Sequence, residues 1–331
     1  MSVPAAKPDR SFAGWVPIHI FRGSPQPEVL WSRLGVQRFD DPFFTQTVTT
    51  ALQSPLAKLL QRTTSLDELV ATSEREPAVE PIGFIFHVSR CGSTLVSQMF
   101  ARLPRIISIS EPQPLMAVAD DPRLSHNDRA RAFGALIRLY SRKVNGSEIG
   151  SVFKFGLREL FAWRAIAKMF PHVPRIVLHS DPVEVLVSNL AQPSEATLPG
   201  NLPPAVLGTL PQPLVTNEDY AAFVLSRIYA FAAEAARAPG SLAVNYTALP
   251  AAVESLIAPH FVIALNDADC AAMREATRLY AKDASQSTEF TPDSAAKQAS
   301  VSASTREWVA KWFQQPCREL LALTATSRRR G

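Results

Sequence analysis

The chain has 331 residues, of which 47% are hydrophobic and 19% are charged, and its formal net charge is +4. This composition excludes an intrinsically disordered chain and a long coiled coil. The small positive charge gives no reason to expect nucleic acid as a partner, because the arginines at residues 328–330 supply much of it.

The first 80 residues are predicted to form an N-terminal arm and one helix packed on the main domain. Several prolines interrupt the start of the chain, and apolar residues at positions 43–60 then recur at helical spacing. Residues 73–81 are polar and flanked by prolines, so we interpret them as a linker. The remaining residues, 81–331, are predicted to form one α/β domain.

From residue 82 onward, predicted strands alternate with predicted helices. The first strand, residues 82–88, is nearly all apolar, as expected for a central parallel strand covered on both faces. Later strands are predicted at residues 106–110, 152–155, 175–179 and 242–246. Helices are predicted at residues 95–103, 130–144, 157–170, 181–190 and 218–237. This order predicts a three-layer α/β fold with a mostly parallel sheet flanked by helices.

Regular periodicity is lost between residues 191 and 213, a stretch that contains six prolines. A loop of this length inside a compact domain is often a lid or a flap that contacts the substrate. A poorly ordered insertion is the alternative of equal weight.

The cysteine content and the lack of long apolar segments indicate in which cellular compartment the protein is expected. The three cysteines, Cys91, Cys270 and Cys317, are too few and too scattered for a disulfide framework or a zinc site, so no metal is expected. Residues 1–15 lack the apolar segment of a signal peptide, and no apolar run approaches the roughly 18 residues that a spanning helix needs. We therefore expect a cytoplasmic protein without membrane partners.

A candidate anion-binding turn, residues 89–94, lies between the first strand and its helix; we call it the anion turn. Gly92 allows main-chain N–H groups to approach a ligand closely, and the N-terminus of the following helix points its unpaired N–H groups at the turn. Ser93 and Thr94 add hydroxyls, and Arg90 adds a fixed positive charge. We expect phosphate as the ligand, since ligands of such sheets bind at the carboxyl ends of strands. An ordinary N-cap turn is the alternative.

Residues 86–95, which read FHVSRCGSTL, resemble the 5′-phosphosulfate-binding loop of sulfotransferases that use 3′-phosphoadenosine 5′-phosphosulfate (PAPS). The arginine is typical of the tyrosylprotein and bacterial branches. Residues 110–112, 180–188 and 245–249 are similar to later segments of the family and fall in the same order. The resemblance covers roughly residues 82–249 and implies a P-loop NTPase-like sulfotransferase fold with PAPS as the donor.

The resemblance implies roles for residues in and near the anion turn. Arg90 would stabilise the leaving phosphate, and the main chain from Cys91 through Gly92 to Thr94, with the hydroxyls of Ser93 and Thr94, would hold the 5′-phosphate. Glu111 corresponds to the family's acidic general base, with a helix-start carboxylate as the alternative. His87 is a competing base, although a core histidine is the favoured interpretation. A buried lysine needs a partner, so Lys154 is expected to face the sulfuryl group or Glu111.

The second half of the expected cofactor site departs from the family pattern. Ser188 and Tyr246 match family positions, but Ser180 stands where the family usually carries arginine, so one bidentate phosphate contact is missing. Lys297 is a candidate to supply that charge, with an ordinary surface lysine as the alternative.

These residues predict a sulfotransferase that acts on a hydroxyl or amine of a small molecule or peptide. Two rival functions stay open. A P-loop kinase using ATP is disfavoured because no lysine follows Gly92, as the Walker A motif requires. A sulfotransferase-like protein that binds a ligand without catalysis is kept open by Ser180.

Overall fold

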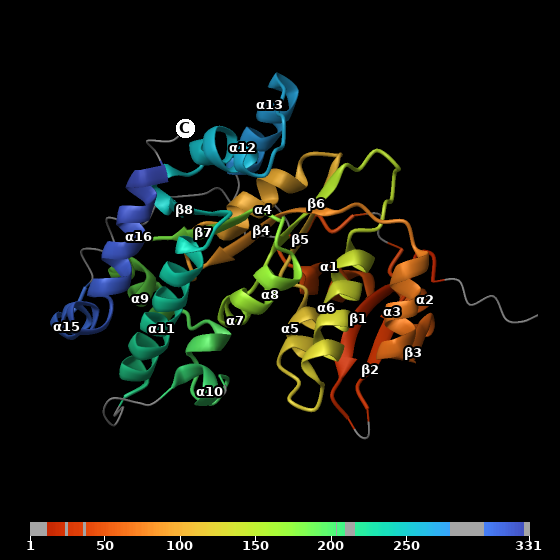
Figure 1. Ribbon diagram of the computed structural model, residues 1–331, viewed down its shortest axis with the longest axis horizontal. Helices are drawn as coiled ribbons and strands as arrows, with labels where there is room; N and C mark the ends of the chain where they lie inside the picture. The colour runs from red at the N-terminus through yellow and green to blue at the C-terminus, as the bar shows by residue number, and fades with distance from the viewer. Residues whose placement is uncertain are drawn as a thin grey trace, which may run out of the picture. The chain divides into compact units, whose positions relative to one another are not determined.

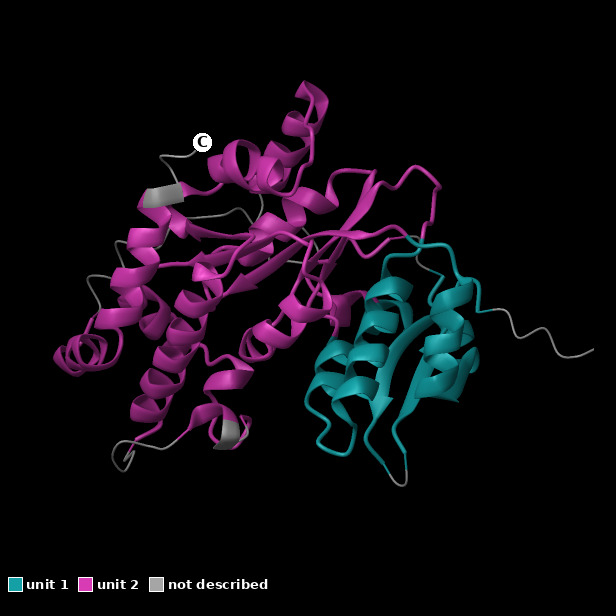
Figure 2. Cartoon of the chain, viewed as in Figure 1, with its two compact units in different colours: residues 1–37, 48–78, 113–142 teal, residues 38–47, 79–112, 143–331 magenta. Residues whose placement is uncertain are grey.

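A computed structural model of the chain describes residues 12–23, 26–35, 38–202, 204–208, 216–278 and 301–327. The chain forms two compact units (Figure 2). Unit 1 comprises residues 1–37, 48–78 and 113–142, and unit 2 comprises residues 38–47, 79–112 and 143–331. These units differ from the division expected at residue 80, because residues 38–47 belong to unit 2 and residues 113–142 to unit 1.

Unit 1 contains an antiparallel sheet in the order β1-β2-β3, made of Val16–Phe21, Glu28–Ser32 and Gln61–Ser65. Its helices are α2 (Pro55–Leu59), α3 (Leu66–Arg75), α5 (Gln113–Ala119) and α6 (His126–Tyr140), and α5 and α6 pack against β1. Trp31 is fully buried on β2 and donates its indole N–H to Thr64 Oγ1 at 2.8 Å. Helix α1 (Phe44–Ala51) contains residues of both units.

The three strands and α3 are not among the elements that the sequence predicts for this region. Strand β3 buries only Thr64, so it shows no apolar alternation, and Pro17 within β1 weakens the strand signal. The linker expected at residues 73–81 is also wrong at its start, because α3 continues to Arg75.

Unit 2 is built on a parallel sheet in the order β5-β6-β4-β7-β8 (Figure 1). The strands are β4 (Pro81–His87), β5 (Ile106–Ser110), β6 (Gly150–Lys154), β7 (Arg175–His179) and β8 (Ser241–Asn245). All strands of this sheet pair in parallel. The predicted α/β fold is therefore confirmed, and each of the five predicted strands is present within two residues of its predicted bounds.

Helices cover both faces of this sheet (Figure 1). Helix α4 (Ser93–Ala101) packs on β4, β5 and β6, and α13 (Asp267–Glu275) packs on α4. Helices α7 (Leu157–Phe161), α11 (Asn217–Arg237) and α16 (Gln314–Ser327) pack on β4, β7 and β8 and on one another. Unit 2 also contains α8 (Trp163–Met169), α9 (Pro182–Ala191), α10 (Pro204–Leu207), α12 (Ala258–His260) and α15 (Ala303–Trp312). Across the part of the chain described, no helix is long and apolar enough to span a bilayer.

The order of the strands makes β4 the point at which the chain changes direction within the sheet. The chain leaves β4 through α4 toward β5 and β6 on one side, and later crosses to β7 and β8 on the other side. Connections that diverge in this way open a crevice at the carboxyl ends of the strands, where ligands of such sheets bind. The anion turn directly follows β4 and therefore lies at the edge of the sheet where a ligand is expected.

Gly83 tests how closely the helical layer approaches β4. A Cβ at Gly83 would lie 2.4 Å from Cδ2 of the buried Phe261 ring, whereas a Cβ at Gly134 on α6 would meet nothing within 4 Å. We expect Gly83→Ala to destabilise the protein by about 1–3 kcal/mol through overpacking, and Gly134→Ala to stabilise it by roughly 0.5–1 kcal/mol. Urea unfolding measures both, and shifts of the same sign would contradict this packing.

Candidate active site

The anion turn has a strained backbone that suits anion binding. Ser89, Arg90 and Gly92 have φ values of 79°, 48° and 77°, all in the left-handed region. Gly92 is the N-cap of α4 and offers no side chain to the first N–H groups of the helix. Main-chain N–H groups in such a turn converge on one concavity, and the helix dipole adds positive potential there. The geometry is that of a receptor for a phosphate-like anion.

Side-chain contacts hold the two non-glycine residues in this conformation, which costs each roughly 1–2 kcal/mol. The backbone N–H of Ser89 donates to His87 Nδ1 at 3.2 Å, and Asn189 Nδ2 donates to Ser89 Oγ at 3.3 Å. Arg90 Nη2 donates to the carbonyl of Gln192 at 2.7 Å. Asn189 and Gln192 both lie at the C-terminal end of α9, so this helix end and β4 together brace the turn.

The other residues of the turn lie as follows. Cys91 is fully buried, and its thiol donates to the carbonyl of Leu178 at 3.4 Å, so its sulfur points into the core. Ser93 and Thr94 are buried in the first turn of α4. Because its side chain points into the core, Cys91 contributes only main-chain groups to the concave surface of the turn.

Tyr246 packs against Gly92. A Cβ at Gly92 would lie 2.9 Å from Tyr246 Cδ2 and 2.7 Å from Leu249 Cδ1. Tyr246 begins a 3-10 turn directly after β8. Residues 245–249, which resemble a late segment of the sulfotransferase family, thus lie against the anion turn. Their side chains approach position 92 so closely that only glycine fits there.

Lys154 and Glu111 form an ion pair at the ends of neighbouring strands. Lys154 ends β6 opposite Ser110 of β5, and the backbone N–H of Glu111 donates to the Lys154 carbonyl at 2.7 Å. The Lys154 ammonium is 1% exposed, contacts Glu111 Oε1 directly and lies 4.6 Å from the centre of the Phe43 ring. Glu111 adopts a left-handed φ of 54°. The buried lysine therefore has the carboxylate partner that its position required.

His87 lies between this ion pair and the anion turn. Its Nδ1 accepts the Ser89 N–H, so the neutral ring carries its proton on Nε2, which lies 3.6 Å from Glu111 Oε1. Burial lowers the pKa of His87, and the positive charge of Lys154 lowers it further. The contact with Glu111 raises this pKa, but burial outweighs it. The ring is buried, as a core histidine would be, but it also contacts both parts of the site.

The environment of Glu111 keeps its carboxylate ionised. Burial alone would raise the pKa of Glu111, but the Lys154 charge and the contact with His87 outweigh it and lower the pKa to about 2. The group is therefore a carboxylate at neutral pH and a weak base while Lys154 stays paired with it.

The described residues at the end of β7 are a buried serine, a neutral histidine and a capping carboxylate. Ser180 is buried, and its carbonyl accepts the Tyr229 hydroxyl at 2.9 Å. Burial lowers the pKa of the neighbouring His179 to about 4, so the ring is neutral at pH 7. Asp181 caps α9 by accepting N–H bonds from Val183 and Glu184. The positive charge that the sequence lacks at Ser180 is therefore not replaced by His179.

Two predicted cofactor contacts remain open. The Ser188 hydroxyl on α9 is buried without a hydrogen-bond partner. Lys297 lies outside the described residues. Within the described ranges, no three His, Cys, Asp or Glu side chains are grouped so that they could hold a metal ion.

The first part of the proline-rich loop lies beside the anion turn. The carbonyl of Gln192, at the start of this loop, accepts a hydrogen bond from Arg90 of the turn. Three residues later, Glu195 Oε1 lies 3.9 Å from Arg158 Nη1 on α7. Glu195 opens the short 3-10 turn Glu195–Thr197. This segment is thus positioned to contact a ligand of the turn.

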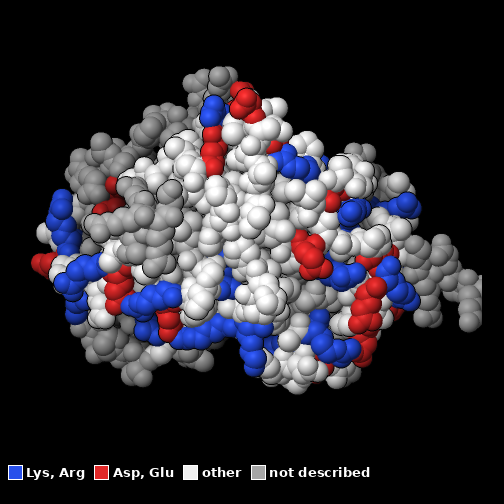
Figure 3. All heavy atoms as spheres, turned by 45° about the horizontal axis from the view of Figure 1, so that its top comes forward, with Lys and Arg blue, Asp and Glu red and all other residues white. Residues whose placement is uncertain are grey.

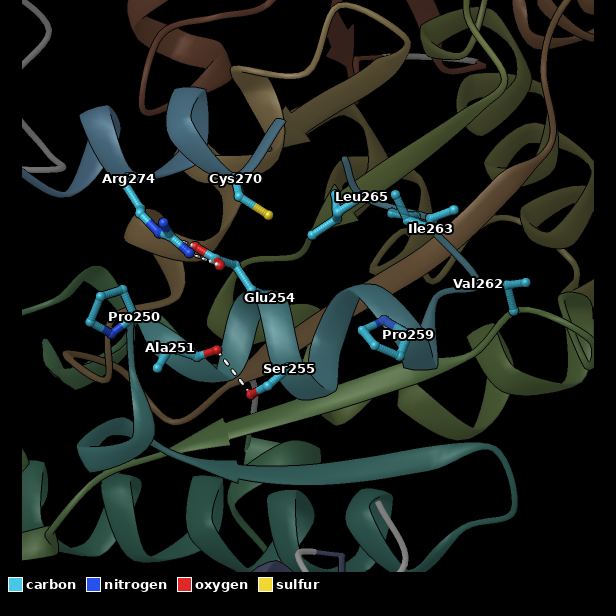
Figure 4. Close-up of a pocket in the computed structure, with 11 residues that line it drawn as sticks. Pro250, Ala251, Glu254, Ser255, Pro259, Val262, Ile263, Leu265, Cys270 and Arg274 are labelled. Atoms are coloured by element: carbon cyan, nitrogen blue, oxygen red, sulfur yellow. Dashed lines mark hydrogen bonds and ion pairs between the residues drawn. The ribbon is translucent and has the colours of Figure 1, made fainter. Parts of the chain in front are cut away.

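A separate open groove of about 970 Å³ runs along the segment from Pro250 to Arg274 (Figure 4). Its lining is mostly apolar, and Arg274 Nη2 pairs with Glu254 Oε2 at 2.6 Å within it. None of the predicted site residues lines this groove. Figure 3 shows an uncharged area in the middle of this face, with basic and acidic side chains around it.

The comparisons with known proteins give only weak likenesses. No family model and no curated protein sequence matches the chain. The chain is similar in structure to the sulfotransferase domain of the Synechococcus PCC 7002 olefin synthase, with a TM-score of 0.43 and 15% identity over 72% of this chain and 96% of that one. For sulfotransferase STF1 from Mycobacterium tuberculosis H37Rv, the TM-score is 0.41 and the identity 16%, over 70% and 80% of the two chains. For STF9 from Mycobacterium avium, the TM-score is 0.44 and the identity 14%, over 76% and 81%. Likenesses of this strength carry no conclusion about function, which has to rest on the residues of the site.

His87 gives a direct test of how the turn is held. In His87→Phe the Ser89 N–H loses its acceptor inside the protein, and we expect a loss of about 1–3 kcal/mol in the free energy of unfolding, together with weaker binding of inorganic phosphate at the turn. Urea denaturation and calorimetric titration measure the two effects. His172→Phe, at an exposed histidine, is the control. Equal effects of the two substitutions would show that His87 does not brace the turn.

Proposed function

We propose that the protein transfers a sulfuryl group from PAPS to a hydroxyl or amine of a small molecule or peptide. One observation carries this proposal: a left-handed anion turn at the start of α4 lies next to a buried lysine–carboxylate pair, with His87 in contact with both. An anion receptor beside a group that accepts a proton is the minimum apparatus for transferring an anionic group to a protic acceptor.

The anion turn is suited to the 5′ end of the donor. Its N–H groups and the hydroxyls of Ser93 and Thr94 would bind the 5′-phosphate, and the α4 dipole would stabilise its charge. Arg90 would exchange the Gln192 carbonyl for the phosphate oxygen that gains charge as the leaving group departs. This exchange gives donor binding a direct effect on the proline-rich loop.

In the transfer step, the acceptor oxygen or nitrogen attacks sulfur, and the bond between sulfur and the 5′-phosphate oxygen breaks. Adenosine 3′,5′-bisphosphate leaves, and the acceptor's proton passes to Glu111. A sulfuryl oxygen near Lys154 would compete with Glu111 for the ammonium. That competition would raise the pKa of Glu111 from about 2 and make it a better base at the moment it is needed.

The strongest rival is a protein of this type that binds its ligand without transferring a group. The depressed pKa of Glu111 and the neutral state of His179 beside Ser180 favour it. A kinase-type phosphotransferase has less support, because no lysine follows Gly92 to reach a β/γ-phosphate pair. We place the activity in the cytoplasm, because Cys91, Cys270 and Cys317 are too few and too scattered in the sequence for a disulfide framework.

Ligand binding and turnover separate these functions. We expect adenosine 3′,5′-bisphosphate to raise the melting temperature, whereas stabilisation by ATP-Mg alone would overturn the sulfotransferase proposal.

Glu111→Gln should lower turnover by about 10²–10⁴-fold and keep nucleotide affinity, because it removes only the proton acceptor. Arg90→Ala should weaken both, with Arg306→Ala on the exposed side of α15 as control. Full turnover in Glu111→Gln would exclude Glu111 as the base.

Lys154→Met tests the coupling between the two charges. Without the ammonium, burial dominates and the pKa of Glu111 rises from about 2. The carboxylate is the active form, so activity should fall at a higher pH in the variant than in the wild type as the solution is acidified. Single-turnover rates against pH measure this shift, and Lys168→Met, at an exposed lysine of α8, should leave the profile in place. An unshifted acid limb in Lys154→Met would contradict the coupling.

A further inference from the structure

The C-terminal half of α9 presents an unused hydrogen-bond acceptor next to the anion turn. Asn189 is 1% exposed, and its Nδ2 donates to the Val185 carbonyl at 2.8 Å and to Ser89 Oγ at 3.3 Å. A carbonyl only accepts, so the contact with Val185 identifies the amide nitrogen without ambiguity. Asn189 Oδ1 is therefore the remaining atom, and it is buried without a hydrogen-bond partner.

The preceding residue offers a second unpaired group. Ser188 Oγ is buried and also has no hydrogen-bond partner. A hydroxyl both donates and accepts, whereas the free oxygen of Asn189 only accepts. A group that donates one hydrogen bond and accepts another would match the hydrogen-bonding capacity of these two atoms. A hydroxyl is such a group, and a phosphate dianion is not, because it has no proton to give.

The charged groups of β7 and α9 themselves supply no cation for a phosphate beside this pair. On β7 and α9 the titratable groups are Arg175, His179, Asp181 and Glu184. Arg175 lies at the amino end of β7 and donates to the carbonyls of Pro239 and Val173, while the pKa of His179 is lowered by burial to about 4. Asp181 and Glu184 are carboxylates on the first turn of α9. The nearby cation, Arg90, donates to the Gln192 carbonyl and faces the anion turn.

We propose that Ser188 and Asn189 bind a ribose hydroxyl of the donor nucleotide, so that a 3′-phosphate adds little to donor binding and a nucleoside 5′-phosphosulfate with a free 3′-hydroxyl also serves. The ribose is the first group beyond the 5′-phosphate, and Ser89 of the anion turn touches Asn189, so the sugar is the part of the ligand within reach. The inference rests on the proposed function, since it assumes that the 5′-phosphate occupies the turn.

Calorimetric titration of the full chain with three nucleotides tests this inference. Adenosine 5′-monophosphate and adenosine 3′,5′-bisphosphate should bind with affinities within about threefold of each other, and 2′,3′-dideoxyadenosine 5′-monophosphate about tenfold more weakly, the loss expected for one or two buried hydrogen bonds. Ser188→Ala should shrink the penalty for the dideoxy sugar. A bisphosphate that binds tenfold or more tightly than the monophosphate overturns the inference and leaves the proposed function standing. Failure of all three nucleotides to bind overturns both.

Ser180→Arg provides a gain-of-binding test at the end of β7. A guanidinium there would add the charge that the described part of the site lacks, and the bisphosphate should then bind about tenfold more tightly than the monophosphate, as one charged hydrogen bond allows. Ser180→Ala is the matched control and should keep the two affinities close. Because Ser180 is buried, the arginine variant is first checked for its fold by circular dichroism, and the three-nucleotide comparison on the wild type decides the question without it.

Discussion

The candidate site depends on one constraint, the left-handed backbone at Ser89 and Arg90 immediately after β4. Left alone, two such residues in succession would relax, because each costs roughly 1–2 kcal/mol. Contacts from His87 below and from the end of α9 above hold them in place. His87 also contacts Glu111, so the strained anion turn and the Lys154–Glu111 ion pair belong to one network of side chains.

This network explains why the site sits on the middle strand of the sheet. Strand β4 is the middle strand and lies between β6, which ends with Lys154, and β7, which Ser180 follows. Its residues can therefore meet a base, a lysine and the sugar-binding end of α9 at once. Pairing with Lys154 keeps Glu111 charged against the effect of burial, and the described end of β7 presents His179 as a neutral ring.

Much of the fold was predictable because the strands of unit 2 are buried on both faces and read as short apolar runs, as residues 82–88 and 175–179 show. Unit 1 was not, because β3 is polar and buries one threonine. In the site, Gly92 and Arg90 are predictable from their position after a strand, Glu111 also from the resemblance to sulfotransferases, and Lys154 as a charge in an otherwise apolar strand. The structure brings Glu111 and Lys154 into contact. The contacts of His87 and Asn189 were missed, since they depend on side-chain orientation across strands and helices far apart in sequence. In the sequence, the one hint of these contacts is the position of Asn189 directly after Ser188.

Hydrogen–deuterium exchange tests most directly whether the anion turn is a phosphate receptor, because it reads the main-chain N–H groups themselves and needs no acceptor substrate. Exchange would be followed in the peptides that span residues 87–97, with and without adenosine 3′,5′-bisphosphate. The account predicts slower exchange at the amides of residues 91–95 on addition of the nucleotide, with a smaller effect at the end of α9. Unchanged exchange there, or protection confined to the groove between Pro250 and Arg274, would contradict it.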